Sequence, residues 1–199
     1  MTRIQAQVEG MPITGLPMNR WHLLLFGFLG MLTLGLIYAW SVFVLPLEKE
    51  FGWDRDQTAL TFSLVMTCFS LGSVAGGHLS VQRGPRLVAT MAGMFTGAGL
   101  FLTSYVQTLL QLYAVYSLIC GLSVGVVYNC IISTVTSWFS DRRGLASGVL
   151  MMGFGFGGLV LGVGASLLID NLGWRTAFRV LGTGSLFIIV GLGQILRVP

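Results

Sequence analysis

The chain has 199 residues, of which 54% are hydrophobic and only 9% are charged. Soluble domains carry about 25% charged residues, so this composition excludes a soluble domain and indicates an integral membrane protein. The formal net charge of +4 comes from basic residues near the ends of apolar runs. It is therefore a signal of membrane topology and gives no reason to expect a nucleic-acid partner.

Long uncharged runs predict six membrane-spanning helices. A span needs about 20 apolar residues to cross about 30 Å of hydrocarbon. The uncharged run at 87–140 is long enough for two spans with a turn at 105–111. Because backbone groups in lipid must be satisfied within their own segment, the spans are expected to be helical. The expected fold is all-α, with helices at 21–46, 58–81, 87–105, 109–138, 145–169 and 176–196.

One loop motif occurs twice. At a shift of 89 positions, the segment 77–86 aligns with 166–175. Leu79, Gly84 and Arg86 then align with Leu168, Gly173 and Arg175. A duplicated loop between apolar spans indicates a unit of three helices that is used twice. Because three is odd, the second unit must be inverted in the bilayer, as in many secondary transporters.

The expected organisation is a cytoplasmic segment at 1–20, a first three-helix repeat at 21–105 and a second repeat at 106–199. With both termini cytoplasmic, most basic residues lie inside, which favours this topology over its reverse. The expected location is the plasma or inner membrane. The inside set is Arg3, Arg20, Arg83, Arg86, Arg142, Arg143 and Arg197, and the outside set is Lys49, Arg55, Arg175 and Arg179.

Glycines four residues apart predict close contacts between the helices. They occur as Gly93-x-x-x-Gly97 in the third span and as Gly153-x-x-x-Gly157 in the fifth. Small residues at this spacing let helix backbones approach each other. We interpret them as packing positions of the bundle.

The first copy of the loop resembles a known family motif. Gly84 permits a tight turn, and the following Pro can begin a helix before Arg86 at the membrane surface. The segment resembles the loop between helices 2 and 3 of the major facilitator superfamily, which reads G-x-L-x-D-x-x-G-x-R and begins here at Gly77. Val81 stands where the family has an aspartate that takes part in an inward-side latch. The second copy keeps an acid, Asp170.

Two further groups of residues narrow the resemblance. The first span is preceded by Asn-Arg-Trp at 19–21 and contains Gly-x-x-Tyr-x-Trp-Ser at 35–41. The fourth span ends in the string W-F-x-D-x-R-G-x-A-x-G at 138–148. Together they resemble the oxalate/formate antiporter family, which is related to the monocarboxylate transporters. The resemblance implies secondary transport of small carboxylates, with gating by two loops that contain Gly77, Gly84, Arg86, Asp141, Arg143 and Gly144.

Tyr38 and Tyr128 are candidate substrate contacts. Each follows a glycine by three residues, and they lie 90 positions apart, at matching places in the two repeats. A phenol can donate a hydrogen bond to a carboxylate while its ring excludes water. The alternative is ordinary packing with the hydroxyl bonded to a backbone carbonyl. The resemblance implies the substrate role, since related carriers place tyrosines from helices 1 and 4 there.

Two amides complete the candidate set. Asn129 begins a polar strip of the fourth span, with Ser133 and Thr136 at helical spacing. Gln57 matches the family string at the outer start of the second span, where a solvated surface position is the alternative.

The spans lack a central charge, and an anion in a low-dielectric cavity normally needs a positive partner. In carriers of this kind, that partner belongs to a second set of six helices. The chain therefore resembles the N-terminal half of a twelve-helix carrier, which predicts the bilayer, a small carboxylate and a second half as partners. A non-transporting remnant or accessory protein is the alternative. The spans contain no Ser/His pair, zinc-ligand spacing or paired carboxylates, so no enzyme, metal or cofactor is expected. Antiport, proton symport and uniport stay open.

Overall fold

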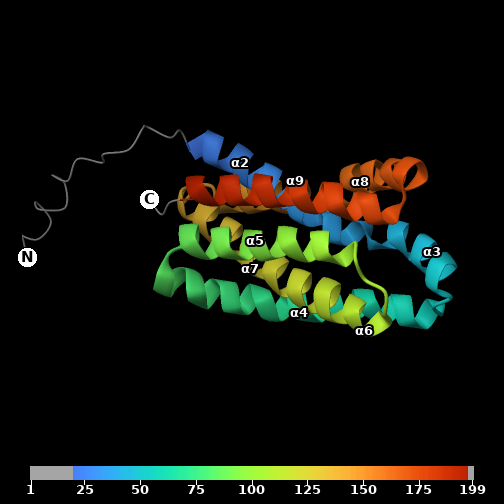
Figure 1. Ribbon diagram of the computed structural model, residues 1–199. Helices are drawn as coiled ribbons and strands as arrows, with labels where there is room; N and C mark the ends of the chain where they lie inside the picture. The colour runs from blue at the N-terminus through green and yellow to red at the C-terminus, as the bar shows by residue number, and fades with distance from the viewer. Residues whose placement is uncertain (1–19, 197–199) are drawn as a thin grey trace, which may run out of the picture.

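The computed structural model describes residues 20–196, and the predictions for residues 1–19 and 197–199 lie outside that part. Its helices confirm the six expected spans, and both the beginning of the first and the end of the last lie at one end of the bundle (Figure 1). The helices long and apolar enough to cross a membrane are Arg20–Phe51, Arg55–Arg83, Pro85–Thr103, Leu109–Ser137, Arg143–Leu172 and Trp174–Ile195.

The first span of each repeat departs from regular α-helix. Span 1 consists of α2 (Arg20–Leu34), a 3₁₀ segment η1 (Gly35–Ala39) and α3 (Trp40–Phe51). Span 4 consists of α6 (Leu109–Leu112), a π-helical segment η2 (Tyr113–Cys120) and α7 (Gly121–Ser137). The other spans are the single helices α4 (Arg55–Arg83), α5 (Pro85–Thr103), α8 (Arg143–Leu172) and α9 (Trp174–Ile195).

Helices α4 and α7 pack so closely that glycine is required at the contact. A Cβ on Gly125 would overlap the carbonyl oxygen of Phe69, and a Cβ on Gly72 would overlap that of Leu122. The two helix backbones therefore touch directly, without intervening side chains.

The first span and α8 also pack through glycines that contact the backbone of the other helix. A Cβ on Gly35 would overlap the carbonyl oxygen of Phe154, and a Cβ on Gly157 would overlap that of Leu32. A shift of 90 positions aligns Leu32 and Gly35 of the first span with Leu122 and Gly125 of the fourth. A shift of 85 positions aligns Phe69 and Gly72 of the second span with Phe154 and Gly157 of the fifth. The contact between spans 2 and 4 thus maps onto the contact between spans 5 and 1, as two inverted repeats require.

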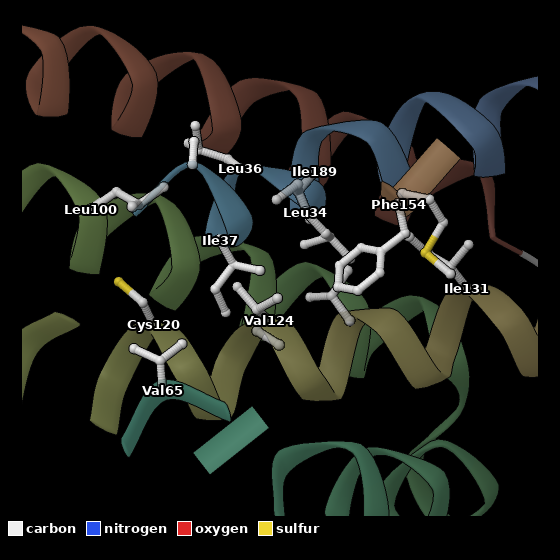
Figure 2. Packing of buried hydrophobic residues seen from close by; sticks show 14 of the residues in the cluster. Leu34, Leu36, Ile37, Val65, Leu100, Cys120, Val124, Ile131, Phe154 and Ile189 are labelled. Atoms are coloured by element: carbon white, nitrogen blue, oxygen red, sulfur yellow. The ribbon is translucent and has the colours of Figure 1, made fainter. Parts of the chain in front are cut away.

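The third helices of the two repeats pack against each other. A Cβ on Gly97 would overlap the Cβ of Leu186, and one on Gly93 would lie 2.6 Å from Cγ2 of Ile189. These contacts confirm that the glycine pair of the third span is a packing site. Between α5, α7 and the first span lies the apolar core, where Figure 2 shows Ile37 beside Val124 and Cys120.

The duplicated loop has the same backbone conformation in both copies. Gly84 joins α4 to α5 with φ 81° and ψ 142°, and Gly173 joins α8 to α9 with φ 80° and ψ 158°. Such positive φ values are strained for residues with a Cβ, which explains the glycine at both places. Pro85 occupies the first position of α5, as expected.

Candidate functional site

Four aromatic rings meet in the middle of the bundle, one each from η1, α4, α7 and α8. Tyr38 contacts Phe154 edge-on with ring centroids 5.0 Å apart, and Tyr128 contacts Phe69 in the same way at 5.2 Å. Phe69 and Phe154 stack at 5.8 Å between the two tyrosines. Tyr128 also lies 4.9 Å from Phe154. The two tyrosines singled out by the sequence are therefore brought into one aromatic cluster.

The aromatic cluster follows the symmetry of the helix contacts. The tyrosines are related by the shift of 90 and the phenylalanines by the shift of 85, so that each edge-on pair maps onto the other. The interplanar angles of the two pairs, 66° and 67°, agree with this relation. Sequence reasoning missed Phe69 and Phe154. The sequence signal for them is a Phe-x-x-Gly motif that occurs at 69–72 and again at 154–157. These two copies are 85 positions apart, whereas the two loop copies are 89 positions apart.

Among the described residues, the phenol hydroxyls of the aromatic cluster have no hydrogen-bond partner. Within the described part of the chain, neither Tyr38 nor Tyr128 uses its hydroxyl in a hydrogen bond to the protein. Tyr38 is 43% exposed although it lies within a span. By contrast, the hydroxyl of Tyr113 donates to the carbonyl oxygen of Gln57 at 3.0 Å. Tyr113 therefore has the backbone-bonded phenol of the alternative interpretation, and the role of Tyr38 and Tyr128 in substrate binding stays a prediction.

Asn129 lies next to Tyr128 in sequence but joins two helices. Its Nδ2 donates to Oγ of Ser73 on α4 at 3.3 Å. Gly77 allows this approach, because a Cβ there would lie 3.2 Å from Oδ1 of Asn129. In this conformation the amide ties α7 to α4, and Gly77 serves their packing.

Gln57 lies apart from the aromatic cluster. Its Oε1 accepts a hydrogen bond from the backbone N–H of Asp54 at 3.1 Å, within a capping box at the start of α4. Twelve residues of helix separate Gln57 from Phe69, a distance of about 18 Å. A substrate contact by Gln57 stays a prediction, and it requires the carboxamide to leave the cap.

Two motifs that are far apart in the sequence meet at one end of the bundle. Nη1 of Arg20 lies 3.0 Å from Oδ1 of Asp141, and the Arg20 guanidinium lies 5.4 Å from the ring centroid of Phe139. Trp21 contacts Phe139 edge-on at 5.4 Å. The string that precedes the first span and the string that ends the fourth therefore form one contact. Next to it, Arg143 begins α8 and is exposed, as is Gly144.

The matching arginines of the two loops have different partners. Nε and Nη2 of Arg86 donate to Oε1 of Gln194 at 3.0 and 2.6 Å, which is a neutral acceptor. Arg175 instead forms an ion pair with Glu50 at 2.9 Å and donates to the carbonyl oxygen of Ser104 at 2.9 Å. Among the described residues, an acid compensates the charge of Arg175 but not that of Arg86.

An all-helical bundle with inverted three-helix repeats and an aromatic cluster in mid-span defines a multi-pass membrane protein of a transporter type. The comparison with protein families agrees: residues 11–199 match the Major Facilitator Superfamily, and the chain belongs to that superfamily.

Relatives of this chain include carboxylate carriers. It is 37% identical to the Oxalate:formate antiporter of Oxalobacter formigenes over 148 residues, which are 72% of this chain and 34% of the antiporter. It is 36% identical to Monocarboxylate transporter 12 of Homo sapiens over 121 residues, which are 59% of this chain and 23% of that transporter. The resemblance drawn from the sequence motifs is confirmed. The chain spans about a third or less of the length of these relatives.

Proposed function

We propose that this chain is the N-terminal half of a secondary active transporter that carries small organic anions, mono- or dicarboxylates such as oxalate or formate, by alternating access. The observation that carries the proposal is the aromatic cluster, in which the hydroxyls of Tyr38 and Tyr128 have no partner among the described residues. We take the two tyrosines as matching positions of two repeats, 21–105 and 106–199. The names of the relatives, which mention oxalate, formate and monocarboxylates, support the substrate class.

The chemistry of the aromatic cluster suits a carboxylate. Each phenol donates one hydrogen bond, and a carboxylate offers two acceptor oxygens. The rings of Phe69 and Phe154 back the tyrosines and limit access of water, which strengthens a hydrogen bond to an anion. Asn129 and Gln57 enter this proposal as further polar contacts after rearrangement of their present hydrogen bonds.

The described residues do not supply a positive partner for the anion in mid-span. Every Lys and Arg of the described part lies in a loop or within two turns of a span end. An anion buried without a cation is costly in low dielectric. A second six-helix half that supplies a basic side chain to the aromatic cluster therefore completes the site.

The surface for the second half is offered by α4 and α8. In their apolar stretches only 22% and 28% of residues are buried, against 33% for α9, 50% for α5 and 61% for the first span. One stripe of α4 is polar, since Ser63, Thr67 and Ser70 are exposed at helical spacing and donate only to carbonyls of their own helix. Such a stripe suits a cavity or a protein partner better than lipid.

Gating takes place, in this proposal, at the end of the bundle that carries both Arg20 and Arg86. The excess of basic residues favours the cytoplasmic side of the plasma or inner membrane for this end. The ion pair between Arg20 and Asp141 is half-exposed, so breaking it costs little. Together with Arg143 and Gly144, it forms a contact that opens and closes as the bundle rocks, while Gly84 fixes the other loop at the same end.

Uptake into liposomes tests the proposal. The purified chain is reconstituted alone and after co-expression with a six-helix C-terminal half of a carrier, and labelled oxalate, formate and lactate are supplied. We expect uptake only with the second half present. If neither preparation takes up any of the three anions although the halves co-purify, the non-transporting accessory function replaces this proposal. Uptake by the chain alone would refute the need for a second half.

A further inference from the structure

Two neighbouring cavities lie beside α5, away from the aromatic cluster. Residues of α4, η2 and α7 also line the first, and the end of α9 also lines the second. The first has a volume of about 470 Å³, lies between α4, α5 and α7, and is lined almost entirely by apolar side chains. The second has a volume of about 490 Å³ and lies at the loop between α4 and α5. Arg83 and Leu87 line both cavities, so the two cavities adjoin at these side chains.

The apolar cavity spans most of the thickness of one membrane leaflet. Its wall on α5 runs from Leu87 to Phe95, eight residues or about 12 Å of helix. Half of the hydrocarbon core measures about 15 Å. Leu87, Met91 and Phe95 are each about half-exposed, so the cavity opens sideways toward the bilayer. An acyl chain that enters from one leaflet therefore fits along it.

The second cavity carries positive charge that the described residues leave uncompensated. Within the described residues Arg83 has no ion pair or hydrogen bond of its side chain, and Arg86 bonds only to the neutral oxygen of Gln194. Val81, which is 87% exposed, stands where the second copy of the loop has an acid. An anion is the complementary ligand for two neighbouring arginines at a membrane surface.

We propose that the two cavities together bind an anionic phospholipid, with an acyl chain in the apolar cavity and the phosphate between Arg83 and Arg86. Neither an inorganic anion nor an apolar molecule satisfies both halves of the site. A phospholipid does, and the bilayer supplies it in contact with the opening. The second copy of the loop is not such a site, because Glu50 already pairs with Arg175 there. This site is independent of the proposed transport function.

Native mass spectrometry of the purified chain in detergent tests the proposal. The chain is titrated with phosphatidylglycerol and with phosphatidylcholine of the same acyl chains. We expect retained phosphatidylglycerol at a several-fold lower concentration than phosphatidylcholine. Arg83→Gln is expected to weaken phosphatidylglycerol binding by about fivefold, the effect of one basic residue near an anionic lipid. Met91→Gln, which makes the exposed wall of the apolar cavity polar, is expected to weaken the binding of both lipids.

The control is Arg142→Gln, which removes an exposed arginine from the same end of the bundle but lines neither cavity. Equal binding of both lipids, or an equal loss in Arg83→Gln and Arg142→Gln, would overturn the proposal in favour of a diffuse attraction to the surface. Displacement of the lipid by millimolar inorganic phosphate would also overturn it, because the acyl chain would then contribute nothing.

Discussion

Replacing Gly125 by alanine is expected to separate α4 from α7 and to destabilise the bundle. The added Cβ would overlap the carbonyl oxygen of Phe69 and would lie 2.7 Å from the backbone nitrogen of Ser73. Ordinary contact begins at 3.4 Å, so the helices have to move apart by at least 0.7 Å. Both obstructing atoms belong to the backbone and cannot rotate away.

The expected cost is that of an overpacked core, about 1–3 kcal/mol of unfolding free energy. Gly155→Ala is the matched control, because Gly155 also lies within a membrane-spanning helix but a Cβ there would have nothing within 4 Å. At that position alanine should stabilise the folded protein by about 0.5–1 kcal/mol, because an unfolded chain with alanine has less backbone entropy to lose than one with glycine. The two substitutions, chemically identical, should therefore change stability in opposite directions.

Unfolding is followed by the loss of helical circular dichroism during titration with sodium dodecyl sulfate in mixed micelles. Gly35→Ala, the equivalent change in the other repeat, should destabilise as Gly125→Ala does. Equal stability of Gly125→Ala and Gly155→Ala would refute the direct contact between the backbones of α4 and α7. A loss in Gly125→Ala but not in Gly35→Ala would refute the equivalence of the two contacts.

Two further predictions concern the loops at the Arg20 end of the bundle. Gly84→Ala should lower the unfolding free energy by about 1–2 kcal/mol in the same titration, because φ is 81° there, whereas Gly144→Ala, which meets open space, should not. Asp141→Asn should cost less than about 1 kcal/mol, because the Arg20 pair is half-exposed, and the cost should fall further in high salt. A cost that salt does not change would show that Asp141 acts through packing.

Hydropathy and the duplicated loop are sufficient to predict the six spans and their inverted arrangement. The shift of 89 positions aligns Gly84 with Gly173, whose backbone angles agree. Several predicted span ends are a few residues short, because a charged residue does not by itself end a helix. Helix α4 already begins at Arg55, because Asp54 and Gln57 cap it with polar side chains. Helix α3 likewise continues past the neutral run to Phe51.

The candidate site is only partly predictable. The glycine three residues before each tyrosine reveals Tyr38 and Tyr128, because both tyrosines repeat at one shift. Phe69 and Phe154 repeat at a different shift, so alignment of the loops hides them. The hydrogen bond from the amide of Asn129 to Ser73 depends on how α4 packs against α7. The sequence of one helix does not reveal this packing.

Exchange of labelled oxalate across liposomes that contain the chain paired with a second half tests the central claim most directly. We expect Tyr38→Phe and Tyr128→Phe each to weaken apparent oxalate affinity by about 10- to 150-fold, the loss of one hydrogen bond to a charged ligand. Tyr105→Phe, which removes an exposed phenol outside the spans, should leave exchange unchanged. Full activity in the double variant Tyr38→Phe/Tyr128→Phe would contradict the assignment of the aromatic cluster as the anion site.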